Sequence, residues 1–268
     1  MNAPYQFNYT QHGDKEKTAL VFLHGFMGRA ADWADIVTSF SDEYLCIAVD
    51  LPGHGKTVVN GGTENYKMEN CAARLIRFMD ELKLSKCDLV GYSMGGRLAL
   101  YLAVHFPERL GKVVIESASP GLKTEQERQV RIAHDEKLAH SLDANPLEQF
   151  LTQWYDQPLF ASLKKDRERF RKLYESRLDN DKVGLSLSLR MMGSGAQPSL
   201  WGELYKVKVP VLLIVGEKDD KFQKIGWEMA AKCKMASLCV ISDAGHNVHF
   251  DNSEEYIRQV RLFLKEQR

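Results

Sequence analysis

The sequence predicts an α/β protein whose mostly parallel central sheet is flanked by helices and carries an inserted all-helical lid. In the first half of the chain, short apolar runs alternate with segments of helical spacing, and a Gly-x-Ser-x-Gly motif joins one such run to the next helix. Alternation of this kind places helices on both faces of a parallel sheet. Because ligands of such sheets bind beyond the carboxyl ends of the strands, functional residues are expected directly after predicted strands.

The elements of the first half follow one another regularly. Strands are expected at residues 18–23, 44–49, 87–90 and 112–116, and helices at 66–82 and directly after Ser93. Apolar residues recur at helical spacing from Met68 to Leu82, as in a helix with one buried face. The sheet resumes at 209–215 and 237–241. A final helix at 253–265 closes the fold, with Ser253 as its expected N-cap and two glutamates behind it.

Between these two parts, from about Pro120 to Trp201, the chain is rich in charged residues and helix formers. Helices are expected at 125–141, 146–155, 164–177 and 182–192. We interpret residues 120–201 as a lid over the catalytic edge, and residues 1–119 and 202–268 as the core. A separate domain is the alternative, although no flexible linker marks its borders.

The composition narrows the class of partner. The 268 residues carry a formal net charge of +0, which gives no reason to expect nucleic acid or an anionic membrane. No apolar run approaches the length of a membrane span, and the first residues lack the basic start and apolar core of a signal peptide. The five cysteines show no zinc spacing. We expect a cytoplasmic protein with no metal or cofactor, and a monomer rather than an oligomer.

The motif at residues 91–95, Gly-Tyr-Ser-Met-Gly, lies between a predicted strand and a predicted helix. The turn is too tight for side chains at its flanks, so glycine is required there and Ser93 is exposed at its tip. A serine becomes a nucleophile or base only beside an imidazole that a carboxylate orients. In this kind of fold the three follow in the order serine, acid, histidine.

The two partners of Ser93 are expected after the last two strands. Asp219 lies in the loop after the strand at 209–215, and His246 follows the strand at 237–241. Glu217 is the alternative acid. His246 and His249 have the spacing of a metal pair, but no third ligand accompanies them. An oxyanion hole needs two backbone N–H donors, which we expect from Met94 and Phe26.

With these residues in place, the core resembles an α/β hydrolase over nearly the whole chain. A narrower resemblance is to the 2-succinyl-6-hydroxy-2,4-cyclohexadiene-1-carboxylate synthases of menaquinone biosynthesis. The matching motifs are Tyr92–Arg97, Glu116–Leu122, Trp154–Phe160, Gln197–Trp201 and Gly216–Phe222. The elbow motif is common among esterases, whereas lid motifs diverge with substrate and are more specific.

The resemblance implies substrate-binding arginines. Arg97 lies four residues after Ser93 on the same helix, and its buried guanidinium needs a carboxylate from the substrate or from the protein, where Glu116 is the candidate. Arg131 and Arg177 hold the matching lid positions, with Arg128 as the rival for Arg131. The same pocket would include Tyr92 and Trp154, although Trp154 equally suits packing within the lid.

The resemblance also implies the reaction. Its substrate is a tricarboxylate, 2-succinyl-5-enolpyruvyl-6-hydroxy-3-cyclohexene-1-carboxylate, from which pyruvate is eliminated. The hypothesis is that Ser93 acts as a general base with His246 and Asp219, and that the oxyanion hole stabilises an enolate. Two alternatives remain open: a serine esterase or carbon–carbon bond hydrolase with the same triad, and a non-catalytic binding protein on a hydrolase scaffold.

Overall fold

The computed structural model describes residues 5–266, so the first four and last two residues of the expected core lie outside the described part. Strands run at β1 (Tyr5–Gln6), β2 (Tyr9–His12), β3 (Ala19–Leu23), β4 (Leu45–Val49), β5 (Val58–Val59), β6 (Cys87–Tyr92), β7 (Leu110–Glu116), β8 (Val211–Gly216) and β9 (Ala236–Ile241). Helices run at α1 (Ala34–Phe40), α2 (Met68–Glu81), α3 (Met94–His105), α4 (Glu125–Ala144), α5 (Leu147–Tyr155), α6 (Arg167–Arg177), α7 (Lys182–Met192), α8 (Asp220–Lys232), α9 (Val248–Asp251) and α10 (Ser253–Lys265).

The central sheet has the strand order β2-β4-β3-β6-β7-β8-β9. Every neighbouring pair is parallel except β2 and β4, so the antiparallel strand lies at one edge. Strands β3, β4 and β6 are buried along their whole length, as expected for a sheet covered on both faces. The predicted fold class is confirmed.

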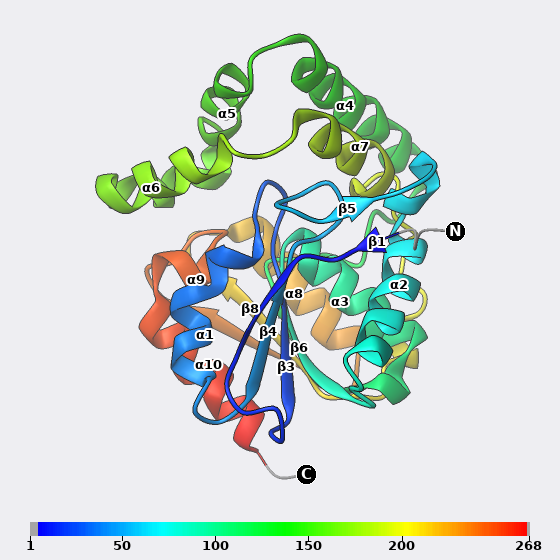
Figure 1. Cartoon of the computed structure of the whole chain (residues 1–268), viewed down its shortest axis with the longest axis vertical. Helices are drawn as coiled ribbons and strands as arrows, with labels where there is room; N and C mark the ends of the chain where they lie inside the picture. The colour runs from blue at the N-terminus through cyan, green and yellow to red at the C-terminus, as the bar shows by residue number, and fades with distance from the viewer. Residues whose placement is uncertain (1–4, 267–268) are drawn as a thin grey trace.

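Two hydrophobic clusters cover the two faces of the sheet. On one face the strands pack against α2, α3 and α8, and on the other against α1 and α10 (Figure 1). The helices α4–α7 form a further layer beyond the ends of the strands, with a cluster of their own around Phe150 and Leu185. Met27, from the loop after β3, belongs to that cluster and so ties the helical layer to the core.

The predicted bounds of the last helix are right but its predicted N-cap is wrong, and the helix expected from residue 164 begins later. The N-cap of α10 is Asn252, whose side chain accepts a hydrogen bond from Glu255 N, and Ser253 is the first helical residue. Helix α6 begins at Arg167 because Asp166 caps it, and a 3₁₀ segment, Pro158–Lys165, occupies the residues before it. The sequence analysis missed α1, α8 and the edge strand β2.

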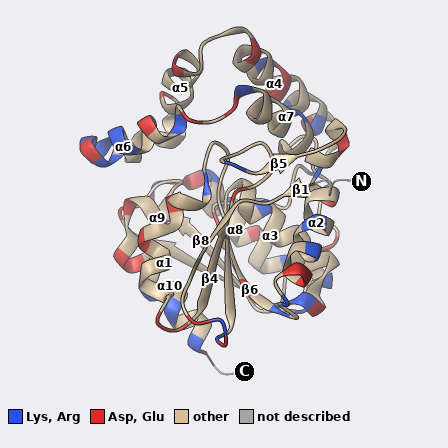
Figure 2. Cartoon of the chain, viewed as in Figure 1, with Lys and Arg blue, Asp and Glu red and all other residues tan. Residues whose placement is uncertain are grey.

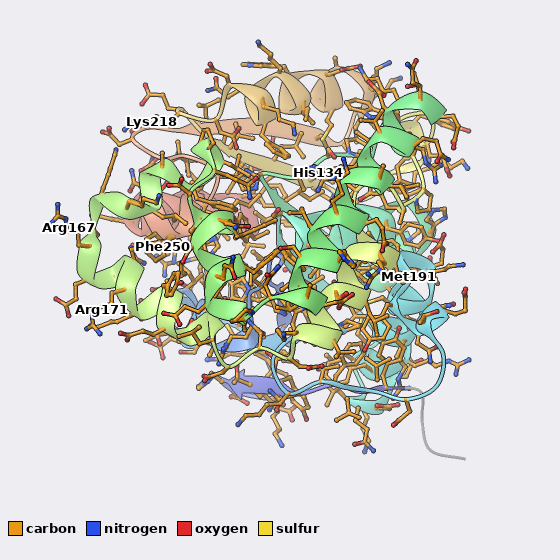
Figure 3. All side chains as sticks on the ribbon, turned by 90° about the horizontal axis from the view of Figure 1, so that it is seen from above. His134, Arg167, Arg171, Met191, Lys218 and Phe250 are labelled. Atoms are coloured by element: carbon orange, nitrogen blue, oxygen red, sulfur yellow. The ribbon has the colours of Figure 1, made fainter. Side chains whose placement is uncertain are left out.

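Basic and acidic residues are intermixed along the helices and loops, while the strands carry few charged residues (Figure 2). Seen from above, α6 lies at the periphery with Arg167 and Arg171 pointing away from the molecule (Figure 3). None of the helices between residues 5 and 266 combines the length and the apolarity that crossing a bilayer demands.

Candidate active site

Ser93 lies at a strained turn between β6 and α3. Its backbone angles are φ 49° and ψ −105°, a conformation that a non-glycine residue holds only where its surroundings enforce it. A Cβ added at Gly95 would lie 2.2 Å from the carbonyl oxygen of Leu23, so only glycine lets the start of α3 approach β3 this closely. Ser93 N donates to the carbonyl of Glu116 at 2.8 Å, which ties the turn to β7.

The structure brings Ser93, His246 and Asp219 together. His246 Nε2 lies 3.3 Å from Ser93 Oγ, and His246 Nδ1 lies 2.7 Å from Asp219 Oδ2. With Nδ1–H donating to the carboxylate, Nε2 is left to accept the serine proton. Asp219 also caps α8, since its Oδ1 accepts from Phe222 N. Glu217 is turned elsewhere and accepts from Asp243 N.

The two expected oxyanion donors, Phe26 and Met94, come from different elements. Met94 is the first residue of α3, where a helix leaves its N–H groups without an intrahelical acceptor. Phe26 lies in the loop after β3, next to Met27, whose positive φ of 67° bends the chain there. Phe26 and Met94 both line the cavity that contains Ser93.

A cavity of about 210 Å³ opens above Ser93 between the sheet and the helical layer. Arg97, Arg131 and Lys221 line it, and among the described residues no Asp or Glu does. Tyr92, Trp154, Phe160 and Phe222 give it an aromatic wall. A cavity lined by three basic side chains and, among the described residues, by no acidic one suits a ligand that carries several negative charges.

Arg97 is held by neutral acceptors. Its guanidinium donates to the carbonyl of Met192 at 2.8 Å and to Gln197 Oε1, and within residues 5–266 it forms no ion pair. Burial, together with the nearby charge of Arg131, lowers the pKa of Arg97 to about 10. The guanidinium is therefore charged near neutral pH and lacks a carboxylate, which is the arrangement that an incoming anion would complete.

The alternative partner of Arg97 is engaged elsewhere. Glu116 is fully buried and accepts hydrogen bonds from His249, with Oε2 2.7 Å from Nδ1. His249 Nδ1 is therefore occupied by this hydrogen bond. In the described part of the chain, no group of three or more His, Cys, Asp or Glu side chains is arranged to hold a metal ion.

The lid arginines take different positions. Arg131 lines the cavity and pairs with the buried Asp135 at 2.7 Å, whereas Arg128 donates to Gly195 O and is not among the lining residues. Arg177 does not line this cavity. It pairs with Asp32 at 2.7 Å, beside the Tyr155 hydroxyl, in an adjoining cavity of about 280 Å³.

Tyr92 and Trp154 line both cavities. A side chain on Gly25 would collide with the Tyr92 ring, so that glycine leaves room for the tyrosine. Trp154 also packs against Phe26, with ring centroids 5.2 Å apart, and it joins the lid cluster. It therefore takes part in lid packing and in the cavity wall at the same time.

Sequence reasoning missed two residues of this site. Gln197 anchors Arg97 and is buried, and Lys221 lines the cavity from the first turn of α8. Both belong to motifs that the resemblance quoted, at 197–201 and 216–222, so the signal was present without an assigned role.

The fold and the Ser-His-Asp arrangement together define an α/β hydrolase by class, and residues 18–253 match the family described as alpha/beta hydrolase fold. The 2-succinyl-6-hydroxy-2,4-cyclohexadiene-1-carboxylate synthase of Serratia proteamaculans is 33% identical over 255 residues, covering 95% of this chain and 96% of that protein. A Bacillus subtilis protein provisionally given the same name is 39% identical and covers 97% of this chain and 94% of its own.

Solved structures agree with these relatives. The structure of MenH from S. aureus has a TM-score of 0.90 and 34% identity, with 98% of each chain covered. The enol-lactonase of Burkholderia xenovorans, at 20% identity and a TM-score of 0.85, shares the fold alone. The chain therefore belongs, within the α/β-hydrolase fold, to the family of 2-succinyl-6-hydroxy-2,4-cyclohexadiene-1-carboxylate synthases.

Proposed function

We propose that this protein is a carbon–oxygen lyase of menaquinone biosynthesis. Its substrate would be 2-succinyl-5-enolpyruvyl-6-hydroxy-3-cyclohexene-1-carboxylate, and its products 2-succinyl-6-hydroxy-2,4-cyclohexadiene-1-carboxylate and pyruvate. Family membership supports the reaction. The proposal includes a cytoplasmic location, a small polycarboxylate as partner, and no nucleic acid, metal or cofactor.

The observation that carries the substrate class is the charge of the cavity beside Ser93. Arg97, Arg131 and Lys221 line it, and among the described residues no Asp or Glu does; Asp135, which is not a lining residue, pairs with Arg131, whereas Arg97 forms no ion pair within residues 5–266. A pocket for an ordinary ester would gain nothing from Arg97, because a half-buried guanidinium without a carboxylate costs free energy. A tricarboxylate would neutralise them, and Arg97, anchored by Gln197, would hold one carboxylate next to the serine.

In this proposal Ser93 acts as a base and forms no acyl intermediate. Its Oγ passes its proton to His246 Nε2 and removes the proton next to the succinyl ketone. The electron pair moves through the ring, the ring C–O bond breaks, and the enolpyruvate released takes up a proton to become pyruvate. The N–H groups of Phe26 and Met94 would stabilise the enolate oxygen, and Asp219 would stabilise the imidazolium.

Residues 120–201 would serve as the lid that encloses the substrate, with residues 1–119 and 202–268 as the core. Tyr92 and Trp154 line both cavities, so a ligand extending past them would approach Arg177 in the adjoining cavity. We keep Arg177 in the proposal as a carboxylate-binding residue on that side. Closure would exclude water, which an elimination does not consume.

Pyruvate release from the enolpyruvyl substrate tests the proposal, measured for the wild type, Ser93→Ala and Arg97→Ala. We expect loss of the base to lower kcat by about 10²–10⁴-fold. Loss of a charge-assisted hydrogen bond should raise KM by about 10–100-fold in Arg97→Ala. Arg258→Ala, on the exposed surface of α10, is the control and should match the wild type.

The competing function makes a different prediction for the same proteins. A serine esterase or carbon–carbon bond hydrolase would release no pyruvate above the spontaneous rate and would cleave esters or diketones quickly, with Ser93 still essential. Near-normal pyruvate release by Ser93→Ala would instead exclude the serine as the base.

A further inference from the structure

Glu116 connects the nucleophile to the loop that carries the catalytic histidine. It is the last residue of β7 and is fully buried. Its main-chain carbonyl accepts from Ser93 N at 2.8 Å. Its carboxylate accepts twice from His249, from the backbone N–H at 3.2 Å and from Nδ1 at 2.7 Å. One buried residue therefore holds both sides of the Ser93–His246 contact.

His249 belongs to the same short segment as His246. At the start of that segment, Gly245 N donates to Asp251 Oδ2 at 2.7 Å, so the segment closes on itself. Such a closed loop still needs a tie to the sheet that sets its distance from Ser93. The two hydrogen bonds from His249 to Glu116 supply this tie, three residues after the catalytic histidine.

The site thus contains two buried acid–histidine pairs with the same Nδ1–oxygen distance of 2.7 Å. Only His246 lines the cavity above Ser93. The ring of His249 stacks on Trp33, with centroids 4.2 Å apart, and meets the Tyr92 ring edge-on at 5.1 Å. Glu116 lines neither cavity, and His249 lines only the adjoining one, so the Glu116 carboxylate does not touch a ligand bound at Ser93.

We propose that Glu116 is a positioning residue which, through His249, sets the distance between Ser93 Oγ and His246 Nε2. That distance is 3.3 Å, at the long end of hydrogen-bond reach, and Ser93 has a strained backbone. A small drift of the histidine loop would therefore uncouple the base from the serine. The inference rests on the proposed triad but not on the proposed substrate.

The first test measures how fast a fluorophosphonate labels Ser93. In this reaction the serine oxygen bonds to phosphorus, fluoride leaves and His246 takes the proton, so the rate reports the serine–histidine contact without the natural substrate. In Glu116→Gln the side-chain NH₂ group faces one of the two N–H donors of His249, and the hydrogen bond from that donor is lost. Displacement of a catalytic group by about 1 Å costs on the order of 100-fold, and we expect labelling to slow about 10- to 100-fold.

A matched variant separates positioning from loss of stability. Asp88 is also a buried carboxylate, at the opposite end of β6, where it accepts from Lys112 N. Asp88→Asn should lower the melting temperature as Glu116→Gln does, yet label at the wild-type rate. Equal labelling of Glu116→Gln and the wild type would overturn the positioning role. Failure of the wild type itself to label at Ser93 would instead overturn the proposed triad.

Two His249 variants identify the contact responsible. Asparagine places its Nδ2 donor near the position of the histidine Nδ1, whereas leucine fills the space without a donor. We expect His249→Asn to label within about threefold of the wild type and His249→Leu to be as slow as Glu116→Gln. Equal slowing in both variants would assign the effect to ring packing on Trp33 and Tyr92 and would contradict the proposal.

Discussion

Gln197 determines where the Arg97 guanidinium lies. Arg97 is half-buried beside Ser93, and its partners are an amide oxygen and a main-chain carbonyl. These neutral acceptors orient the guanidinium without cancelling its charge, so it remains available to an anionic ligand. Neutral anchoring of this kind is a form of preorganisation, because the side chain is ordered before the ligand arrives.

Replacement of Gln197 should therefore weaken substrate binding. Gln197→Leu removes the anchor, and we expect KM for pyruvate release to rise about tenfold, the equivalent of one charge-assisted hydrogen bond. Gln197→Glu should raise KM further, since a carboxylate at this position would compete with the substrate for Arg97. Gln129→Leu, on the exposed face of α4, is the control. A lower KM in Gln197→Glu would show that Arg97 does not meet a substrate carboxylate.

Single residues of the site could be predicted from the sequence where local geometry limits the choice. Ser93 follows from its glycines and its place between strand and helix, and Asp219 and His246 follow from strand ends. The contact of Gln197 with Arg97 and that of Glu116 with His249 could not be predicted, since each joins segments about 100 residues or more apart. The N-cap role of Asp219 was an available signal that α8 begins there.

At the level of secondary structure, the elbow depends on close approach between α3 and β3. Gly95→Ala would place a methyl group 2.2 Å from Leu23 O and 2.7 Å from His24 O, both main-chain atoms that cannot move aside cheaply. We expect a loss of about 3 kcal/mol in unfolding free energy, measured by chemical denaturation, together with loss of Ser93 labelling. Gly62→Ala meets nothing within 4 Å and should leave both quantities unchanged. Normal labelling in Gly95→Ala would disprove the role of this close approach.

The ion pair between Arg177 of α6 and Asp32 joins the helical layer to the core and should make stability depend on pH. Burial alone would raise the pKa of Asp32, but the charge and hydrogen bonds of Arg177 outweigh it and lower the pKa. Because the folded-state pKa lies below the unfolded value, about 3.9, the stabilisation is complete above that pH. It is lost as the pH falls from about 4 through the folded-state pKa.

Asp32→Asn tests this pair. It leaves Arg177 buried without a counter-charge, and we expect the unfolding free energy at pH 7 to fall by about 3–5 kcal/mol. The variant should also lose the part of the wild-type pH dependence below about pH 4 that comes from this carboxylate. Asp179→Asn breaks the exposed pair with Arg29 nearby and should change little. If the unfolding free energy of Asp32→Asn falls below about pH 4 as steeply as that of the wild type, other carboxylates cause the loss of stability in acid.

The regular elements of the lid were predictable because α4 and α7 have strong helix formers and clear caps, Thr124 and Asp181. How the lid lies on the core was not, because the contacts that decide it are spread over distant segments. Asn180, for example, donates to Met27 O, and Gly184 packs against Gly53. Those contacts also place Arg177 opposite Asp32, away from the cavity above Ser93.

The whole molecule carries no formal net charge, whereas the described residues that line the cavity beside Ser93 include basic side chains and no acidic ones. Thirty-six Lys and Arg residues offset 36 Asp and Glu residues, and both signs are spread along the helices and loops (Figure 2). Long-range attraction of an anion by net charge is therefore absent, and the local cations Arg97, Arg131 and Lys221 supply what attraction there is. Added salt should shorten the range over which these cations attract an anion, since the Debye length falls from about 30 Å at 0.01 M to about 3 Å at 1 M.

We therefore expect KM for the tricarboxylate to rise between 0.01 M and 0.5 M salt, on the order of tenfold, with kcat almost constant. The fluorophosphonate labelling rate, which involves a neutral reagent, should stay flat over the same range. In Arg97→Ala combined with Arg131→Ala and Lys221→Ala, KM should be high and nearly independent of salt. A salt dependence that persists in this triple variant would place the attraction outside the cavity, whereas none in the wild type would mean that these cations do not bind the substrate carboxylates.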